Sequence, residues 1–450
     1  MRFRDGLIAA RSHIVFILAL SFSIVLILKL EEFELGPDTA PRVELTPGIP
    51  DSVHRPLTQA ETQAAAAAWR YFATQTRAET GFADMVADFP VATLWTAGSQ
   101  IMATLSAEKL KLIPPREAEA RIAALLAGLG RLPRFEDRLP GRFHNTVSLA
   151  PVDRDGQATG RETGYRDLGW SAVDLGRLLT ALTLARRDHP GLAPSIDGLL
   201  AGWDLGAAVE NRFLQAARRL PDGTVELHQE GRLGFEQYAA KGFALLGYDV
   251  SNAASLAGKL AWRTVEEVSV PLDARPSFPG TRTNSVSEPW IYDGLEYGWD
   301  RVGQELAWRI YKAQEARAAV TGLPVTAGEG PVDRKPWFVQ QPVTQEGRDW
   351  GLIGGDAGEA DQLRTAASKI AFGWGVLLGT PYADKLLAET AAAADAEKGW
   401  RAGIYTATRQ VNGALSLETN AMILQSLAFR SHGPLMRSWM HAPPTKAAAR

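Results

Sequence analysis

Hydrophobic residues recur at helical spacing along most of the chain after residue 58. In the segment 93–108, for example, Leu94, Ile101, Met102 and Leu105 fall on one face of a helix. Similar segments follow one another and are separated by turn residues and prolines. The segments predicted to be helical are 59–75, 93–108, 116–129, 171–187, 205–220, 235–246, 252–262, 288–297, 301–320, 366–378, 382–394 and 416–430.

Local signals support several of these helices. Thr58 is placed as the N-cap of the first helix, and Glu61, three residues later, completes a capping box. Pro114 and Pro115 favour a helix start before the segment 116–129. Strand signals are few, and they predict one short hairpin arm over Thr224–His228.

This order of elements predicts an all-α fold, because it contains no alternating strand–helix units. About a dozen helices with alternating short and long connections favour an (α/α)6 toroid, in which the loops of the inner helices line one mouth. An α-solenoid is the alternative, but the chain has no repeat of fixed length. We therefore expect one toroid domain over residues 58–433 and a C-terminal tail over residues 434–450.

An apolar run near the N-terminus predicts a membrane anchor. Residues 14–28 are almost entirely apolar, a little short of the ~20 residues that a spanning helix needs. Arg2, Arg4 and Arg11 precede the run, and basic residues keep that end of a segment in the cytoplasm. A cleaved signal peptide is the alternative, but small-x-small cleavage signals are missing after the run. We expect a cytoplasmic tip and an uncleaved anchor over residues 1–34.

The segment between the anchor and the first helix predicts a spacer. Residues 35–57 are rich in Pro and lack helical periodicity. With this topology the protein is a single-pass protein of the inner membrane, and its C-terminal domain faces the periplasm.

Composition and charge exclude several classes of function. The chain has 48 Lys and Arg against 51 Asp and Glu, and a net charge of −3 gives no basis for nucleic-acid binding. The absence of Cys excludes disulfides, thiolate zinc sites and cysteine nucleophiles. Seven scattered His without an HExxH motif predict no metal site, and no organic cofactor is expected.

Carboxylates among aromatic residues are the remaining chemical signal. Glycoside cleavage uses two carboxyl groups, and sugar rings favour flat aromatic faces with polar edges. The segment 285–299 places Glu288 and Asp293 among Trp and Tyr residues, and Glu236 lies at the start of the helix 235–246. For each acid alone, a helix-capping or ion-pair role is the competing interpretation.

Five segments of the chain resemble one bacterial family. This family is a membrane-anchored domain of unknown function. It is similar in turn to the glucoamylase-like (α/α)6 domains of cyclic β-1,2-glucan synthases and to β-1,2-glucanases. The resemblance covers nearly the whole chain after the spacer. It is carried by segments 93–135, 164–182, 230–249, 285–299 and 399–427.

The resemblance implies which acids carry the chemistry. Asp174, in the sequence GYRDLGWSAVDLGRLLTAL, falls on an acidic position of the family, and Glu236 and Glu288 fall on two functional glutamates. This chain departs from the sequence of the family in one segment. Relatives have N-W-Y-D-T-R-T-L-x-P-L where residues 143–152 of this chain read FHNTVSLAPV and lack the Tyr-Asp pair. A protein that binds sugar without catalysing a reaction is therefore an alternative interpretation.

We expect a periplasm-facing glycoside hydrolase or transglycosylase that acts on a β-glucan or related bacterial exopolysaccharide. Glu288 is the expected general acid and Glu236 the nucleophile or base, with Asp174 and Asp293 as further catalytic candidates. The alternatives are a non-catalytic polysaccharide-binding or scaffold subunit of an envelope glycan synthesis or export system, and an envelope-integrity protein without a sugar ligand. The expected substrate contacts are Trp95, Trp170, Tyr238, Lys241, Trp290, Trp350, Tyr405 and Glu418.

Overall fold

The computed structural model of this protein describes residues 43–277, 283–354 and 360–436. The predicted anchor over residues 14–28 and nearly all of the predicted tail lie outside these residues. Among the described residues, no helix is both long enough and apolar enough to cross a membrane.

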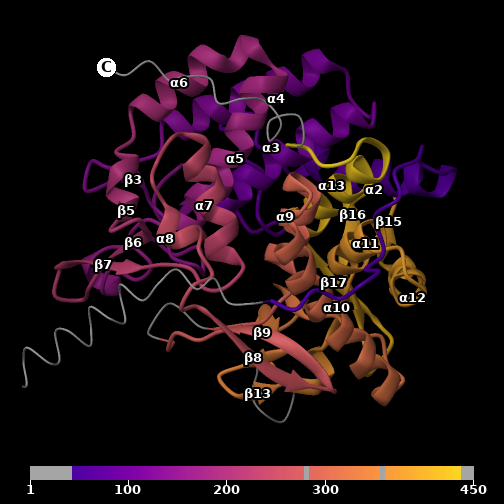
Figure 1. Cartoon of the computed structure of the whole chain (residues 1–450). Coiled ribbons are helices and arrows are strands. Elements are labelled where there is room, and N and C mark those ends of the chain that lie inside the picture. The colour runs from indigo at the N-terminus through magenta and orange to yellow at the C-terminus, as the bar shows by residue number, and fades with distance from the viewer. Residues whose placement is uncertain (1–42, 278–282, 355–359, 437–450) are drawn as a thin grey trace, which may run out of the picture. The chain divides into compact units, whose positions relative to one another are not determined.

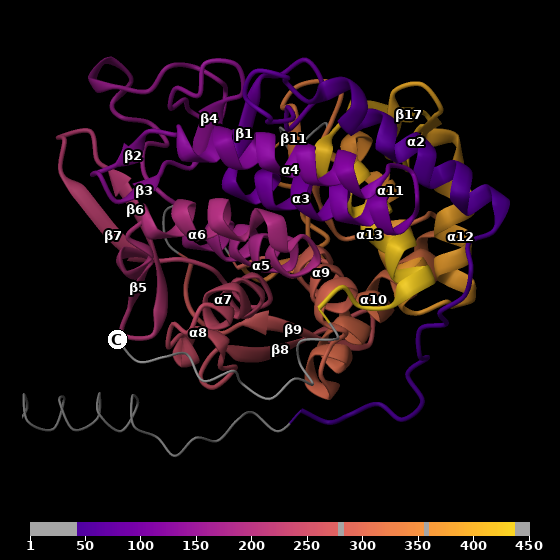
Figure 2. The same ribbon diagram turned by 90° about the horizontal axis from the view of Figure 1, so that it is seen from above.

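Six helices form an inner ring (Figures 1 and 2). Each contacts the next along the chain, and the last, α13, contacts the first, α3, so that the ring closes. The inner helices are α3 (Leu94–Lys109), α5 (Ala172–Asp188), α7 (Phe235–Leu245), α9 (Glu288–Tyr297), α11 (Ser368–Leu377) and α13 (Leu417–His432).

Six further helices alternate with the inner ones along the chain, and each contacts an inner helix. The alternation of inner and outer helices is the arrangement that the sequence predicts. The outer helices are α2 (Gln59–Gln75), α4 (Pro115–Gly130), α6 (Ala193–Ala201), α8 (Ser251–Ala254), α10 (Arg301–Thr321) and α12 (Pro381–Thr390).

Small residues let the inner helices approach closely. A Cβ atom on Gly176 of α5 would lie 2.4 Å from the carbonyl oxygen of Ala239 in α7. A Cβ atom on Gly242 of α7 would lie 2.0 Å from the carbonyl oxygen of Gly176. Because the two backbones are in contact here, any larger side chain would force α5 and α7 apart.

Most predicted helix boundaries are confirmed to within one or two residues. Thr58 caps α2, and Glu61 completes the predicted capping box. The segment 288–297 forms α9 with the predicted bounds. The helix α6 was not predicted, and its short sequence holds two buried residues, Ile196 and Leu199.

Two predicted helices are wrong. Residues 205–220 form a short 3-10 helix and then the strands β5 (Val209–Glu210) and β6 (Phe213–Arg219). β6 pairs with β7 (Val225–Gln229), which is the hairpin arm predicted over Thr224–His228. Ala, Arg, Leu and Gln favour helix intrinsically, but pairing and burial of the middle of β6 override this preference.

The second wrong prediction, over residues 252–262, contains only the single turn of α8. The chain then enters a hairpin made of β8 (Leu260–Val265) and β9 (Val268–Asp273). This hairpin lies at the lower edge of the view in Figure 1. Trp262, Thr264 and Val265 belong to a run with the composition of a strand rather than of a helix.

The expectation of an all-α chain therefore needs correction, because the connections carry several short antiparallel pairs. The fold is helix-rich, and the strands decorate its loops. The remaining strands are β1 (Val91–Thr93), β2 (Arg134–Phe135), β3 (Leu139–Pro140), β4 (Phe143–Asn145), β10 (Gly328–Pro331), β11 (Phe338–Gln341), β12 (Thr344–Gln345), β13 (Arg348–Asp349), β14 (Thr365–Ala367), β15 (Ala394–Asp395), β16 (Gly399–Tyr405) and β17 (Val411–Leu415).

The described part of the predicted spacer, residues 43–57, is bound to the domain. The backbone N–H and hydroxyl of Thr46 donate to Glu305 of α10 at 2.7 and 2.9 Å. The backbone N–H of Arg55 donates to the carbonyl of Arg430 in α13 at 2.9 Å. These residues are therefore part of the folded domain and not a free linker.

Candidate functional site

The long connections of the chain gather at one end of the inner ring. Each inner helix except α13 leads to its outer partner through a short connection, such as residues 298–300 between α9 and α10. Such short connections make the two helices antiparallel, so the six inner helices run in the same direction. The long, hairpin-bearing loops, such as residues 322–367, all lead into the first turns of inner helices.

This arrangement brings six first turns together at the N-terminal end of the ring. Four of the six inner helices present a carboxylate there, which the positive end of a helix dipole favours. The residues in these first turns are Trp95 of α3, Asp174 of α5, Glu236 of α7, Glu288 of α9, Lys369 of α11 and Glu418 of α13.

Glu288 is buried and is bound on one oxygen. Its Oε1 accepts from the backbone N–H of Glu329 at 2.7 Å and from Lys369 Nζ at 3.0 Å. Its Oε2 is buried and has no hydrogen-bond partner among the described residues. Glu288 is therefore held by Lys369 and a backbone N–H on one oxygen only.

Glu329, on β10, brings a further acid to the same place. Burial, together with the negative charge of Glu288, raises the pKa of Glu329, although Lys369 and a 2.8 Å bond from Gln340 act against this shift. Burial alone would lower the pKa of Lys369, but the charges of Glu288, Glu329 and Glu418 raise it overall. Lys369 is therefore a fixed cation among three acids.

Glu418 is partly exposed at the start of α13. Its Oε2 accepts from the hydroxyl of Tyr292 at 2.5 Å, and its Oε1 has no partner among the described residues. The charge of Glu418 also acts on Asp174, Glu329 and Lys369. We call Asp174, Glu288, Glu329 and Glu418, with Lys369, the acidic cluster.

Asp174 has a pKa well above the ordinary value of an aspartate. Burial raises the pKa of Asp174 to about 7, against the positive charge of Arg142 and with the help of the negative charges of Glu230 and Glu418. The side chain is nevertheless partly exposed. Asp174 therefore holds a proton near neutral pH at a position that solvent can reach.

Glu230 fixes the turn that carries Asp174. Both of its carboxylate oxygens accept from the hydroxyl of Ser171 at 3.0 Å, and Oε2 accepts from the backbone N–H of Val173 at 3.1 Å. Arg142 forms an ion pair with the same carboxylate. These contacts hold the start of α5 in place and keep a second negative charge near Asp174.

A buried ion pair closes the ring interior beneath the cluster. Arg177, one helical turn after Asp174, is fully buried and donates to Ser99, Tyr238 and Glu296 at 2.6–2.9 Å. Its guanidinium lies 3.8 Å from the ring centroid of Tyr292. Tyr238, predicted as a substrate contact, donates to Glu296 at 2.6 Å and is buried in this network.

Glu236 does not join the acidic cluster through any contact among the described residues. It is fully buried and is bound by Arg275 at 2.7 Å, Lys259 at 3.0 Å and Gln229 at 3.0 Å. Lys259 and Arg275 flank the β8–β9 hairpin, so Glu236 ties this hairpin to α7. An acid with three donors around it is a structural ion-pair centre, and the geometry does not favour the predicted role as nucleophile or base.

Asp293 and Lys241 lie deeper along their helices. They form an ion pair with each other, and Lys241 lies over the ring of Tyr297 at 4.8 Å. Burial raises the pKa of Asp293, and the charge of Asp300, which follows the C-terminal end of α9, adds to the shift. Both residues lie beyond the first turns of α7 and α9, and the predicted roles in catalysis and substrate contact are not supported by this position.

Most aromatic residues predicted to contact sugar are core residues. Trp170 is 1% exposed and donates its indole N–H to the carbonyl of Gln215 at 3.1 Å. Tyr405 is equally buried and donates to Asp333 at 2.7 Å, and Trp290 and Trp350 are also buried. Only Trp95, partly exposed at the start of α3, remains beside the cluster, where its ring contacts Tyr292.

The residues that the sequence prediction missed are Glu329, Lys369, Glu230 and Arg142. Glu329 lies within the long Pro/Gly-rich stretch 321–364, which the sequence marks as a cover for a site. Lys369 stands in an otherwise apolar helix, and such a charge signals a buried partner. Arg142 and Glu230 carry no distinguishing local pattern.

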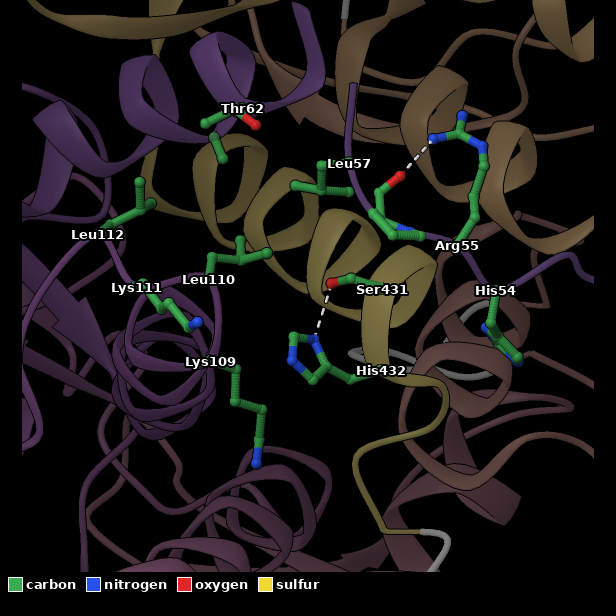
Figure 3. A pocket seen from close by; sticks show the side chains of 12 residues that line it. His54, Arg55, Leu57, Thr62, Lys109, Leu110, Lys111, Leu112, Ser431 and His432 are labelled. Atoms are coloured by element: carbon green, nitrogen blue, oxygen red, sulfur yellow. Dashed lines mark hydrogen bonds between the residues drawn. The ribbon is translucent and has the colours of Figure 1, made fainter. Parts of the chain in front are cut away.

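A cavity lies at the opposite end of the ring, where the inner helices end (Figure 3). It has a volume of about 520 Å³, and its lining includes Lys109 and His432, the last residues of α3 and α13, and Lys111. No carboxylate lines it, so it does not offer the pair of carboxyl groups that glycoside cleavage uses. Within the described ranges there is also no group of His, Asp and Glu that would hold a metal ion.

Comparison with known proteins places the chain in a family. The chain belongs to the family described as "Protein of unknown function (DUF3131)", whose model matches residues 63–433. The resemblance predicted from the sequence is thereby confirmed. No curated protein matches this DUF3131 chain in sequence.

Solved structures share the fold of this DUF3131 chain. An endo-β-1,2-glucanase from Chitinophaga pinensis aligns with a TM-score of 0.62 at 12% identity, over 86% of this chain and 96% of its own. A glucoamylase-like protein from Bacteroides caccae gives 0.62 at 11% identity, over 85% and 96%. An endo-β-1,2-glucanase from Talaromyces funiculosus gives 0.53 at 12% identity, over 84% of each chain. At these identities the comparison establishes the fold.

The raised pKa of Asp174 predicts a pH-dependent effect on the free energy of unfolding. A carboxyl that binds its proton more tightly in the folded chain destabilises the fold as pH rises from about 4 to about 7. Asp174→Asn should therefore stabilise the DUF3131 chain at pH 8 by roughly 1–4 kcal/mol and should have little effect at pH 4. Urea unfolding at both pH values measures the difference.

Asp384→Asn is the matched control, since Asp384 is an exposed first-turn aspartate of the outer helix α12. Its effect should differ by less than about 0.5 kcal/mol between the two pH values. If Asp174→Asn behaves like this control, Asp174 does not hold its proton near neutral pH.

Proposed function

We propose that this protein is a glycoside hydrolase or transglycosylase that acts on a β-glucan or related bacterial polysaccharide. One observation carries the proposal: Asp174, with a pKa of about 7, shares the N-terminal end of the ring with Glu288, which is paired with Lys369, and with Glu418, which accepts from Tyr292. A proton-bearing acid and a carboxylate in one place are the groups that glycoside cleavage needs.

In this proposal Asp174 is the general acid. It donates its proton to the glycosidic oxygen as the bond to the leaving sugar breaks. We assign the role of nucleophile, or of base that activates water, to Glu418, a partly exposed residue whose Oε1 is buried without a hydrogen-bond partner among the described residues. This assignment replaces Glu288 and Glu236 as the acid–base pair, because Glu288 is buried against Lys369 and Glu236 is held by two cations.

Glu288 has a supporting role in the same proposal. Its ion pair with Lys369 fixes the charge distribution of the cluster, while its Oε2 is buried and has no hydrogen-bond partner among the described residues. The substrate class follows from fold and residues together: the structural relatives include endo-β-1,2-glucanases, and the cluster offers carboxylates to hydroxyl groups without a metal. Linear and cyclic β-1,2-glucans are therefore the first substrates to test.

A non-catalytic glycan-binding role is the second candidate. It is favoured by the burial of five of the six Trp and Tyr residues predicted to contact substrate, which leaves Trp95 as the one that is partly exposed beside the cluster. A protein of this kind would bind the glucan and release no products.

The first test is product formation from β-1,2-glucan by the full-length chain. Asp174→Asn and Glu418→Gln should each lower the rate by roughly 10²–10⁴-fold, because each removes a proton-transfer or nucleophilic group. Asp384→Asn should leave the rate unchanged. Products would be separated by chromatography, and glucan binding without products in the unaltered chain would establish the non-catalytic role.

A second test uses two glycines of β10. A Cβ atom on Gly328 would lie 2.6 Å from Glu288 Oε1, whereas one on Gly330 would meet no atom within 4 Å. Gly328→Ala should displace Glu288 from Lys369 and from the backbone N–H of Glu329, and it should lower the rate by roughly ten- to hundredfold. Equal rates for Gly328→Ala and Gly330→Ala would show that the position of Glu288 has no part in the reaction.

We also propose that the domain faces the periplasm and is held at the inner membrane by the apolar segment 14–28. This proposal rests on the sequence: the basic residues before the segment and its apolar length support it. The full-length chain should stay with bacterial membranes during alkaline extraction, and a chain that starts at residue 40 should not. Release of the full-length chain into the soluble fraction would contradict the anchor.

A further inference from the structure

A small cavity lies between two hairpins in the long loops. It has a volume of about 230 Å³ and is formed by the β8–β9 hairpin and the β12–β13 hairpin. β8, β9 and β13 lie together at the lower edge of the view in Figure 1. The side chains that give the cavity its chemistry are Trp262, Arg263, Thr283, Thr344 and Glu346.

Trp262 supplies an exposed aromatic surface to this cavity. Its side chain is 37% exposed, although an exposed indole forgoes the free energy of burial. The guanidinium of Arg309 lies 4.9 Å from the ring centroid, and Arg309 is itself bound to the buried Glu305 at 2.6 Å. The ring is therefore held in one orientation before any ligand arrives, which lowers the entropy cost of binding.

The polar wall of the cavity is also fixed. Arg263 donates to both carboxylate oxygens of Asp349 at 2.6 and 3.1 Å and to the carbonyl of Gly347 at 3.0 Å. Glu346 and Gly347 both have positive φ, at 47° and 82°, as a two-residue hairpin turn requires. A rigid indole face with hydroxyl, carboxylate and guanidinium groups around it matches a pyranose, which has an apolar face and polar edges.

The cavity is connected to the acidic cluster through the start of α9. The backbone N–H of Ser285 donates to the carbonyl of Thr344 at 3.1 Å. Ser285 lies three residues before Glu288, so their Cα atoms are at most roughly 11 Å apart. Asn284 donates to Gln340, which in turn donates to Glu329 of the cluster.

Unsatisfied polar atoms lie along this connection. Two side-chain atoms have no hydrogen-bond partner among the described residues: the nitrogen of Gln345, a residue that is 8% exposed, and the oxygen of Asn284. Buried polar groups without partners are costly. Both atoms are closed to solvent and neither residue lines the cavity, so they belong to the packing behind it.

From these observations we propose that the Trp262 cavity is a distal sugar subsite, which binds a unit of the glucan chain away from the bond that is cleaved. The inference rests on the proposed function and adds to it that the protein prefers long glucans. In this proposal a disaccharide bound at the acidic cluster leaves the cavity empty, whereas a long chain occupies both.

The test measures glucan binding by calorimetry in the full-length Asp174→Asn variant, which binds substrate without turning it over. Trp262→Ala in this background should weaken the affinity for a long linear β-1,2-glucan by roughly five- to thirtyfold. It should change the affinity for the disaccharide sophorose by less than about twofold. Trp262→Phe, which keeps a flat ring, should retain most of the affinity for the long glucan.

Trp337→Ala is the matched control, because Trp337 is 59% exposed and does not line the cavity. It should leave both affinities unchanged. The subsite is overturned if the long glucan binds equally well to the Trp262→Ala variant, or if Trp337→Ala weakens binding as much. If the Asp174→Asn chain binds no glucan of any length, the proposed function itself fails.

Discussion

The shared direction of the six inner helices is the constraint on which the rest of the structure depends. Short connections from inner to outer helices impose this direction, and the long loops must then return to the same end of the ring. Residues that are far apart in sequence, such as Asp174 and Glu418, thereby become neighbours. Six helix N-termini at one end also provide a positive potential that tolerates several carboxylates.

These carboxylates differ in the groups that contact them in the folded chain. Glu288 is neutralised by Lys369 and a backbone N–H, Glu236 by Lys259 and Arg275, and Asp174 keeps a proton because no cation contacts it as closely. Beneath them the Arg177–Glu296 ion pair fills the ring interior with a satisfied polar network. A buried pair of this kind is weak evidence for stability, and the partly exposed Asp174 and Glu418 lie above it at the N-terminal end of the ring.

The sequence was sufficient for the parts of the fold that are determined locally. Thr58 and Glu61 form the predicted capping box, and α9 has the predicted bounds. The segment 205–220 was mispredicted because its residues favour helix, whereas their pairing with β7 depends on a strand outside that window.

The candidate site could be predicted only in part. The acids at the starts of α5, α9 and α13 were among the candidates, since first-turn acids are visible in a helical pattern. The ion pairs of Glu236 with Lys259 and Arg275 join residues far apart in sequence, and no local pattern reveals them. The burial of Trp170 and Tyr405 likewise depends on tertiary packing, since indole and phenol groups serve equally as core and as sugar contacts.

A crystal structure of the Asp174→Asn variant soaked with a β-1,2-glucan oligosaccharide would test the proposed site directly. We expect a glycosidic oxygen within hydrogen-bond distance of residue 174 and a sugar carbon facing Glu418, at the N-terminal end of the inner ring. Sugar density at the opposite end of the ring, or on an outer helix, would contradict it.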